Sequence, residues 1–266
     1  MVNLKFQRVD YRNHNTPILF DREIDDYAHS ILADYKPELL QEARAINYQH
    51  FLESYLGMHL YYQDIYYDDP DRPILALTAF KSGMMKVFNR EQKCVDKILV
   101  HERTVVMDNA IMRPNKDYLA RFSGMHEGGH AILHWHVYTG KTFDGDVFNP
   151  DYIHDGEVDS FVCCRRENIE RSKAKQLSTA EEWREHQADY FAAAITMPNA
   201  TFKPFVTKLL RDCGYYKGAI TVNDDDSDSD ILAEDILPDA ISETYGVSKR
   251  AARIKLRKTG FVFGYN

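Results

Sequence analysis

Cysteine is scarce in this chain, and the few thiols are not arranged for cross-linking. The 266 residues include only four cysteines. Two of them, Cys163 and Cys164, are neighbours and make a poor disulfide pair with each other, and no C-x-x-C spacing occurs. The sequence therefore predicts neither a disulfide scaffold nor a structural zinc ribbon, and scattered thiols of this kind are typical of a reducing cytosol.

Long apolar runs and an excess of basic residues are also missing. No apolar stretch approaches the ~18 residues that span a bilayer, and the N-terminal sequence MVNLKFQRVDYRNHNTP lacks the apolar core of a signal peptide. Asp and Glu number 41 against 33 Lys and Arg, for a formal net charge of −8, which argues against bulk nucleic-acid binding. These absences predict a cytoplasmic protein without a membrane segment.

The residues that are present form an ordinary globular composition, with 44% hydrophobic residues and no internal repeat. In the first half, apolar spacing predicts a helix over 21–35, and Pro37 and Gly57 bracket a second helix from Pro37 to about Tyr55. Short aromatic and β-branched segments from about 60 to 109, separated by turn residues, then predict three or four antiparallel strands. Helices beside an antiparallel sheet indicate the α+β class.

The second half begins with a helix that is expected to start near Asp117. The segment EVDSFVCC is a candidate strand, and 178–196 is a predicted helix in which Ser178 and Glu181 form a capping box. We expect three parts along the chain: a main domain over 1–222, an acidic loop over 223–230, and a helical segment over 231–266.

The stretch RFSGMHEGGHAILHWH, residues 121–136, concentrates histidines on one predicted helix. His126 and His130 are four residues apart, so both imidazoles lie on one helix face and can reach one ion at the ~2.0–2.1 Å of zinc–nitrogen bonds. Glu127 lies about 100° round the helix, where it can reach a metal-bound water rather than the metal. The alternative is a partly buried helix with hydrogen-bonded histidines and no metal.

A second segment, EEWREHQADYFAAAITMP, favours the metal interpretation. Glu185 and Asp189 are again four residues apart on a predicted helix and face one way. Glu185 can supply a third ligand, and Asp189 can accept the outer N–H of a ligating histidine. Three protein ligands with an open position are typical of a catalytic zinc site.

These two segments together resemble the ImmA/IrrE-type metallopeptidases. RFSGMHEGGHAILH is similar to that family's R-F-T-x-A-H-E-L-G-H-x-x-L-H signature, and EHQADYFAAAITMP is similar to its E-x-E-A-N-x-F-A-x-x-L-L-M-P segment. The resemblance implies a zincin-like α+β fold with a small antiparallel sheet beside the active-site helix. It also implies Zn²⁺ held by His126, His130 and Glu185, with Glu127 as the base.

The resemblance further implies a zinc endopeptidase whose protein substrate is a helix-turn-helix repressor of a mobile element or stress response. The alternative is a non-catalytic regulatory protein on the same scaffold that binds DNA or a repressor. Three positions depart from the family pattern without removing a ligand: Gly128 replaces Leu, Asp189 replaces Asn, and Gln187 replaces Glu. Adjacent glycines at 128 and 129 should cost the helix on the order of 1 kcal/mol.

The remaining histidines have other expected roles. His134 is one turn beyond His130, ~6 Å along the axis, so we expect it to pack and hydrogen-bond rather than to ligate the same ion. His154 and Tyr152 are candidate transition-state donors, as is His136, although an ordinary surface or loop position is the simpler expectation for these histidines.

The C-terminal sequence AISETYGVSKRAARIKLRKTG has the layout of a helix-turn-helix, with Gly246 at the turn and Ser248 as a cap. Six basic residues and no acidic residue lie between Lys249 and Lys258, which could contact phosphates. The alternative is a helical hairpin that packs on the catalytic domain or docks a repressor. We favour the second interpretation, without DNA contact.

Overall fold

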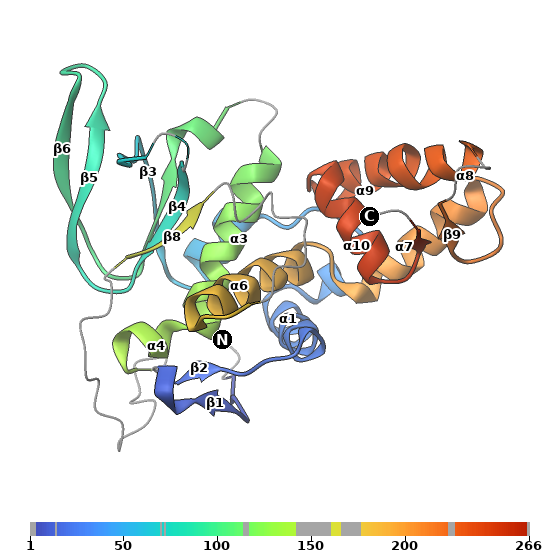
Figure 1. Ribbon diagram of the computed structural model, residues 1–266, viewed down its shortest axis with the longest axis horizontal. Coiled ribbons are helices and arrows are strands. Elements are labelled where there is room, and N and C mark those ends of the chain that lie inside the picture. Colours follow the sequence, from blue (N-terminus) through green and yellow to red (C-terminus); the bar gives the residue numbers. More distant parts are fainter. Residues whose placement is uncertain are drawn as a thin grey trace.

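The computed structural model describes residues 4–264 except 14, 70, 72, 114–116, 142–160, 166–176 and 223–226. These residues form helices together with four small sheets, which confirms the α+β class (Figure 1). None of the described helices is long and apolar enough to cross a membrane. Of the described cysteines, Cys94 and Cys213 are free thiols.

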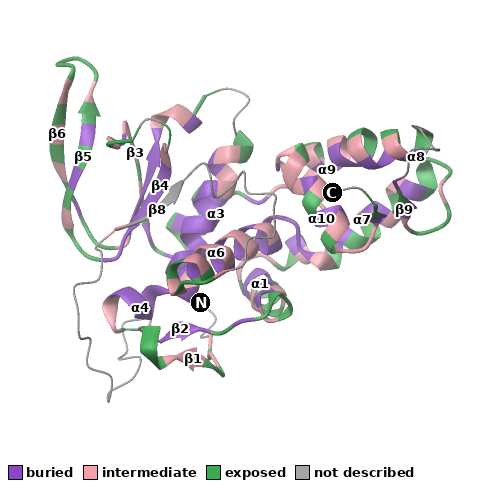
Figure 2. Cartoon of the chain, in the orientation of Figure 1, coloured by how far each residue is buried: buried purple, intermediate pink, exposed green. Residues whose placement is uncertain are grey.

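Three long helices form the centre of the molecule: α1 (Asp21–Tyr35), α3 (Asp117–Leu133) and α6 (Ala180–Thr196). The α6 helix packs against α3 and also contacts α1, so it lies between them (Figure 1). Most of α3 from Ser123 onward is buried, as the purple ribbon in Figure 2 shows. The predicted bounds of α1 and the predicted start of α3 are confirmed. A short helix, α4 (Trp135–Thr139), continues directly after α3.

The main sheet packs on α3 and has the strand order β3-β7-β4-β8. Its strands are β3 (His59–Gln63), β4 (Ile74–Ala79), β7 (Thr104–Asp108) and β8 (Phe161–Arg165). The β4–β7 and β4–β8 pairs are antiparallel, but β3 pairs with β7 in parallel. The prediction of a purely antiparallel sheet was therefore wrong, because β7 returns between β3 and β4.

A hairpin of β5 (Gly83–Asn89) and β6 (Cys94–Val100) separates β4 from β7 along the chain. It projects from the main sheet at one end of the molecule (Figure 1). Because the chain leaves β4 into this hairpin and comes back into β7, strands β4 and β7 are neighbours although two strands lie between them in sequence. The range 60–109 thus holds more strands than the three or four expected.

The predicted helix from Pro37 to Tyr55 is not continuous. The chain forms a short 3₁₀ turn, η2 (Pro37–Leu40), and restarts at residue 48 with two further turns, α2 (Tyr48–His50) and η3 (Phe51–Tyr55). The Asn47 side chain accepts a hydrogen bond from the His50 amide at 3.0 Å and so caps the restarted helix. The Ile46 carbonyl accepts from Arg121 on α3 at 3.0 Å, which takes the place of a bond within a helix.

The small elements at the N-terminal end contact α4 and α6: the Asn15 carbonyl accepts from His136 and the Pro17 carbonyl from Gln187. They are β1 (Val9–Asp10), η1 (Tyr11–Asn13) and β2 (Thr16–Pro17), with β1 and β2 paired antiparallel. A further 3₁₀ turn, η4 (Asn109–Ile111), links β7 to the segment before α3.

A second hydrophobic core lies at the C-terminal end, beyond α6 (Figure 1). It is built from α7 (Asn199–Asp212), β9 (Ile220–Thr221), η5 (Leu232–Ile236), α9 (Leu237–Tyr245), α10 (Lys249–Lys258) and β10 (Val262–Phe263). The β9 and β10 strands pair in parallel. Because α7 and β9 share this core, it extends across the domain boundary predicted at residue 222; the domain division itself stays a prediction.

The acidic segment at 223–230 is not entirely a loop, contrary to the prediction. Helix α8 (Ser227–Ile231) begins inside it. A helix start tolerates several carboxylates because they interact favourably with the exposed amides and the positive end of the helix dipole. The same effect made the acidic run a poor indicator of a loop.

One glycine joins the two cores. Gly246 ends α9 with φ +62°, and its carbonyl accepts a hydrogen bond from the Arg121 guanidinium on α3. A side chain at this position would collide with the Arg121 guanidinium as well as strain the left-handed backbone. The turn predicted at Gly246 and the Ser248 cap are confirmed, since Ser248 accepts from the Ala251 amide at 3.1 Å.

Candidate metal centre

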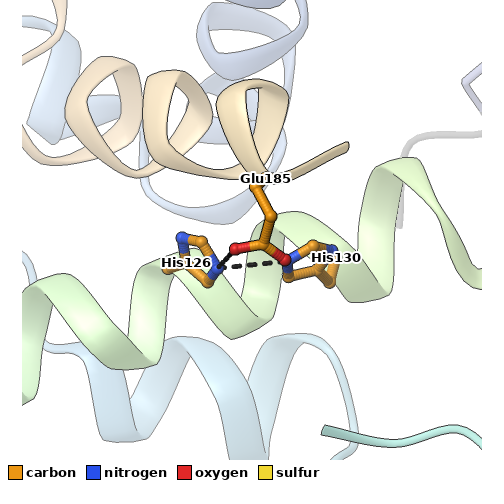
Figure 3. Close-up of side chains that lie close together, drawn as sticks. All are labelled: His126, His130 and Glu185. Atoms are coloured by element: carbon orange, nitrogen blue, oxygen red, sulfur yellow. Dashed lines mark hydrogen bonds and ion pairs between the residues drawn. The ribbon is translucent and has the colours of Figure 1, made fainter. Parts of the chain in front are cut away.

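Two imidazoles and one carboxylate converge between α3 and α6. His126 and His130 lie one turn apart on α3, and Glu185 reaches them from α6 (Figure 3). The two Nε2 atoms are 3.0 Å apart, and the carboxylate oxygens of Glu185 lie 3.5 Å from His126 Nε2 and 3.2 Å from His130 Nε2. This group could hold a metal ion. The predicted convergence of these residues from two distant segments is confirmed.

The spacing of the donor atoms of these three residues fits a small divalent ion. Ligands ~2.0–2.1 Å from a tetrahedral zinc ion lie about 3.3 Å from one another. The two Nε2 atoms are 3.0 Å apart, and each lies 3.2 or 3.5 Å from a different carboxylate oxygen of Glu185, all close to that edge length. Both histidine side chains are fully buried and that of Glu185 is 14% exposed, so a bound ion would be largely shielded from bulk water.

The outer nitrogen of His126 is held by Asp189, one turn after Glu185 on α6. Asp189 Oδ1 lies 2.8 Å from His126 Nδ1. A carboxylate only accepts hydrogen bonds, so the Nδ1 atom carries the proton and the Nε2 atom presents a lone pair toward Glu185. The geometry agrees with the position predicted for Asp189.

The outer nitrogen of His130 begins a chain of hydrogen bonds. His130 Nδ1 lies 3.0 Å from His134 Nδ1, and His134 Nε2 lies 2.8 Å from the Gln187 side-chain oxygen. The Gln187 amide then donates to the Pro17 carbonyl at 2.7 Å. The amide nitrogen of Gln187 donates to Pro17, so its amide oxygen must accept from His134. All hydrogen bonds in this series therefore donate in the same direction, from His130 toward Pro17.

That direction fixes the tautomer of His130. His134 donates from Nε2 to Gln187, so its Nδ1 accepts the proton of His130 Nδ1. Burial, followed by the neighbouring His130, lowers the pKa of His134 well below its usual value, which keeps this ring neutral and able to accept. The expected packing and hydrogen-bonding role of His134 is confirmed, and the proton on His130 Nδ1 leaves its Nε2 lone pair for a ligand.

The two inward lone pairs are the best test of whether a cation fits. Both Nε2 atoms are deprotonated in this assignment, and they face each other at 3.0 Å. Two lone pairs and an adjacent carboxylate repel one another unless a positive charge lies among them. Burial raises the pKa of Glu185, but positive charge on His130 and His126 would outweigh burial and lower the pKa overall. With both Nε2 atoms deprotonated, a bound cation would supply that positive charge instead. The donor set therefore fits a divalent cation.

Glu127 follows His126 on α3, about 100° round the helix, and contacts the main sheet. Its side chain is fully buried, and the Thr78 hydroxyl on β4 donates to Glu127 Oε2. Burial raises the pKa of Glu127, although the neighbouring His126 and His130 oppose the shift. A carboxylate with a raised pKa is a stronger base than one in water, which suits proton transfer near neutral pH.

Gly129 allows α3 and α6 to come this close. A Cβ atom on Gly129 would lie 3.1 Å from Phe191 Cδ1 and 3.2 Å from the Ala188 Cα, both on α6. Gly128 faces the opposite side, toward the side chains of Phe51 and Leu52 in η3. The expected cost of the glycine pair in helix propensity is thus offset by the close approach that brings Glu185 to the histidines.

The sequence missed one contact of this centre and misjudged another residue. Thr78 is the polar residue within the buried segment ILALTAF, and that isolated hydroxyl was the available signal. The sequence analysis expected His136 at the surface or in a loop. It is instead buried on α4, where its Nε2 donates to the Asn15 carbonyl at 2.9 Å. The candidate donors Tyr152 and His154 lie outside the described residues.

Comparisons of the chain with protein-family models, with curated proteins and with solved structures found no match. The resemblance to the ImmA/IrrE-type metallopeptidases therefore stays a prediction that rests on the two sequence segments.

Proposed function

We propose that the protein is a zinc-dependent endopeptidase. The observation that carries this proposal is the convergence of His126, His130 and Glu185 around one position, with Glu127 on the same helical turn. Two imidazoles and one carboxylate leave a tetrahedral ion with a fourth, open position, which is the arrangement of hydrolytic rather than structural zinc sites. Mixed nitrogen and oxygen donors at this spacing favour zinc over magnesium or calcium.

In the proposed reaction, each residue of the centre has a separate task. Zinc, when bound, would supply a Lewis acid that polarises the scissile carbonyl and lowers the pKa of a water molecule. Glu127 accepts the proton of the attacking water and delivers it to the nitrogen of the leaving amine. The Thr78 hydroxyl orients the Glu127 carboxylate, and Asp189 holds the His126 ring in the ligating tautomer.

The proposed substrate is a regulatory protein with a helix-turn-helix, and the proposed family is that of the ImmA/IrrE-type metallopeptidases. Both rest on the resemblance of the two segments, as does a zincin-like fold. DNA contact by α10 is not part of the proposal. Lys249, Arg253 and Arg257 of this helix pair with acidic residues of α9 and η5 at 2.5–3.0 Å, which reduces the positive charge available to phosphates.

A second candidate is a regulatory protein that binds a repressor without cutting it. The full burial of Glu127 favours this candidate, because a base must reach a water molecule beside the substrate. The two candidates share the metal centre and differ in whether a peptide bond is broken. Metal analysis alone does not separate them, whereas a cleavage assay does.

The test is cleavage of candidate repressors encoded beside this chain, together with a peptide library, by the zinc-loaded protein. New N-termini would be identified by mass spectrometry. The matched control is Glu127→Gln, which keeps the size and the Thr78 contact but cannot accept the proton. We expect this variant to fold, to retain zinc and to lose cleavage. Cleavage at the wild-type rate by Glu127→Gln would remove the proposed base, and repressor binding without cleavage by the wild type would favour the second candidate.

A further inference from the structure

A cavity of about 600 Å³ lies where α10 meets α3 and α6. Its volume is in the range of small-molecule sites, ~300–1,000 Å³. It adjoins the metal centre without being part of it: of the described residues that line it, none is one of the three candidate ligands or Glu127. Asp189 and Phe122 form the shared wall, and the Phe122 ring lies 6.5 Å from that of His126.

Basic side chains gather on the α7 and α10 side of this cavity. They are Lys203, Arg250, Lys255 and Lys258. The acidic residues that line it are Asp25 and Asp189, and the Asp189 carboxylate already accepts from His126. The cavity wall therefore carries more positive than negative charge, which focuses a positive potential within a partly enclosed space.

Lys255 shows that this charge is incompletely balanced. Its side chain is 7% exposed, and its ammonium lies 3.9 Å from the Asp25 carboxylate, beyond hydrogen-bonding distance. Burial lowers its pKa to about 8, against the attraction of Asp25 and with smaller contributions from Lys258 and Lys203. Lys258 pairs with Asp21 at 3.2 Å, but both side chains are nearly half exposed, and such surface pairs are weak.

Another part of the lining is apolar. Leu119 and Phe122 come from α3, Ala193 from α6, and Ala251 and Ile254 from α10. On α10, residues 251, 254, 255 and 258 follow helical spacing, so one face presents both the apolar and the cationic part of the wall. The first turn of α10 also lines the cavity, and the positive end of a helix dipole favours an anion there.

We propose that this cavity binds a small amphipathic anion: a ligand with one carboxylate or phosphate head and an apolar body. The head would lie among the lysines and the first turn of α10. The body would contact the apolar wall formed by α3 and Ile254. This inference does not depend on the proposed peptidase activity, because it uses neither the metal ligands nor Glu127.

The test uses the full-length protein and the fluorescent probe 1-anilinonaphthalene-8-sulfonate, which is itself an amphipathic anion. Octyl phosphate, octanoate and octylamine compete for the probe, so the same apolar chain carries two anionic heads and one cationic head. We expect both anions to displace the probe and octylamine not to displace it. The ratio of the two anion affinities then identifies the preferred head.

Two variants of equal charge locate the site. In Lys203→Gln/Lys258→Gln, both changes line the cavity, and the dissociation constant of octyl phosphate should rise at least about tenfold through the loss of charge-assisted hydrogen bonds. In Lys208→Gln/Lys217→Gln, both changes are exposed on the same C-terminal unit but outside this cavity, and the dissociation constant should not change. Ala251→Phe should block binding by filling the cavity.

Three results would overturn the proposal. The first is an equal affinity of the two double-lysine variants for octyl phosphate. The second is displacement of the probe by octylamine as effectively as by the anions. The third is a short poly-aspartate peptide that binds more tightly than either octyl anion, which would assign the cavity to an acidic protein segment. The double-lysine variants change exposed side chains, so they decide the matter even if Ala251→Phe does not fold.

Discussion

Replacing Gly129 by alanine should weaken metal binding although it favours the helix. A Cβ atom at this position would lie 3.1 Å from Phe191 Cδ1, 3.2 Å from Ala188 Cα and 3.3 Å from the Ala188 carbonyl oxygen. Two of these three atoms belong to the backbone of α6 and cannot rotate away. The neighbouring Gly128 is the matched control, because there the nearest atoms are Leu52 Cδ2 at 3.3 Å and Phe51 Cε1 at 3.5 Å, the ends of side chains.

The magnitude follows from the contact distances. Carbon atoms in ordinary contact are ~3.5–4.0 Å apart, so α6 must move away from α3 by at least about 0.3–0.4 Å in Gly129→Ala. A metal site tolerates changes of about 0.2 Å in its ligand distances. We therefore expect zinc affinity to fall about tenfold. Overpacking costs about 1–3 kcal/mol and alanine returns about 1 kcal/mol of helix propensity, so the free energy of unfolding should fall by about 0–2 kcal/mol.

The assay is competition for zinc with a chromophoric chelator, together with urea unfolding of the metal-free proteins. Gly128→Ala should keep the wild-type zinc affinity and gain up to about 1 kcal/mol of stability. Equal zinc affinities for Gly128→Ala and Gly129→Ala would refute the claim that the approach of α6 sets the position of Glu185.

Three further predictions concern residues around the centre. Thr78→Val should lower kcat/KM about tenfold with zinc retained, since Glu127 loses its hydroxyl donor; restoration by Thr78→Ser is the check, and an unchanged rate would exclude an orienting role. Asp189→Ala should weaken zinc binding about 10–100-fold in chelator competition, because the His126 tautomer is no longer fixed; unchanged affinity would contradict this. Burial lowers the pKa of His136 from 6.5 to about 4, so on acidification the unfolded chain binds a proton at this residue before the folded protein does. The free energy of unfolding should therefore fall by up to about 3 kcal/mol as the pH drops from about 6.5 to 4, since each pKa unit corresponds to about 1.36 kcal/mol. His136→Gln should flatten this dependence in urea unfolding at several pH values, and an unchanged slope would assign the acid sensitivity to other groups.

Most of the candidate site residues could be predicted from helix spacing. The i, i+4 relations of His126 with His130 and of Glu185 with Asp189 depend only on local backbone geometry, which the sequence specifies well. The meeting of the two helices could be inferred because three buried polar groups need a common partner. The predicted N-cap of α6 was one residue too early: Thr179 and Glu182 form the capping box rather than Ser178 and Glu181.

Contacts between distant segments could not be predicted in the same way. The parallel pairing of β3 with β7 depends on where the chain returns after the β5–β6 hairpin, which no local pattern encodes. In the break between η2 and α2, the Ile46 carbonyl accepts from Arg121, which lies 75 residues away in the sequence. Thr78 and the partner of His134 are likewise visible only once β4 and α6 are placed against α3. The choice of zinc and of a repressor substrate stays a prediction.

Metal stoichiometry and affinity test the central claim most directly. Elemental analysis of the purified chain after zinc loading and gel filtration should give one zinc per chain for the wild type and for Glu127→Gln. Glu185→Ala should bind zinc at least about 100-fold more weakly, because it removes one of three ligands. A wild-type protein that holds no zinc, or a Glu185→Ala variant that holds it as tightly as the wild type, would contradict the account.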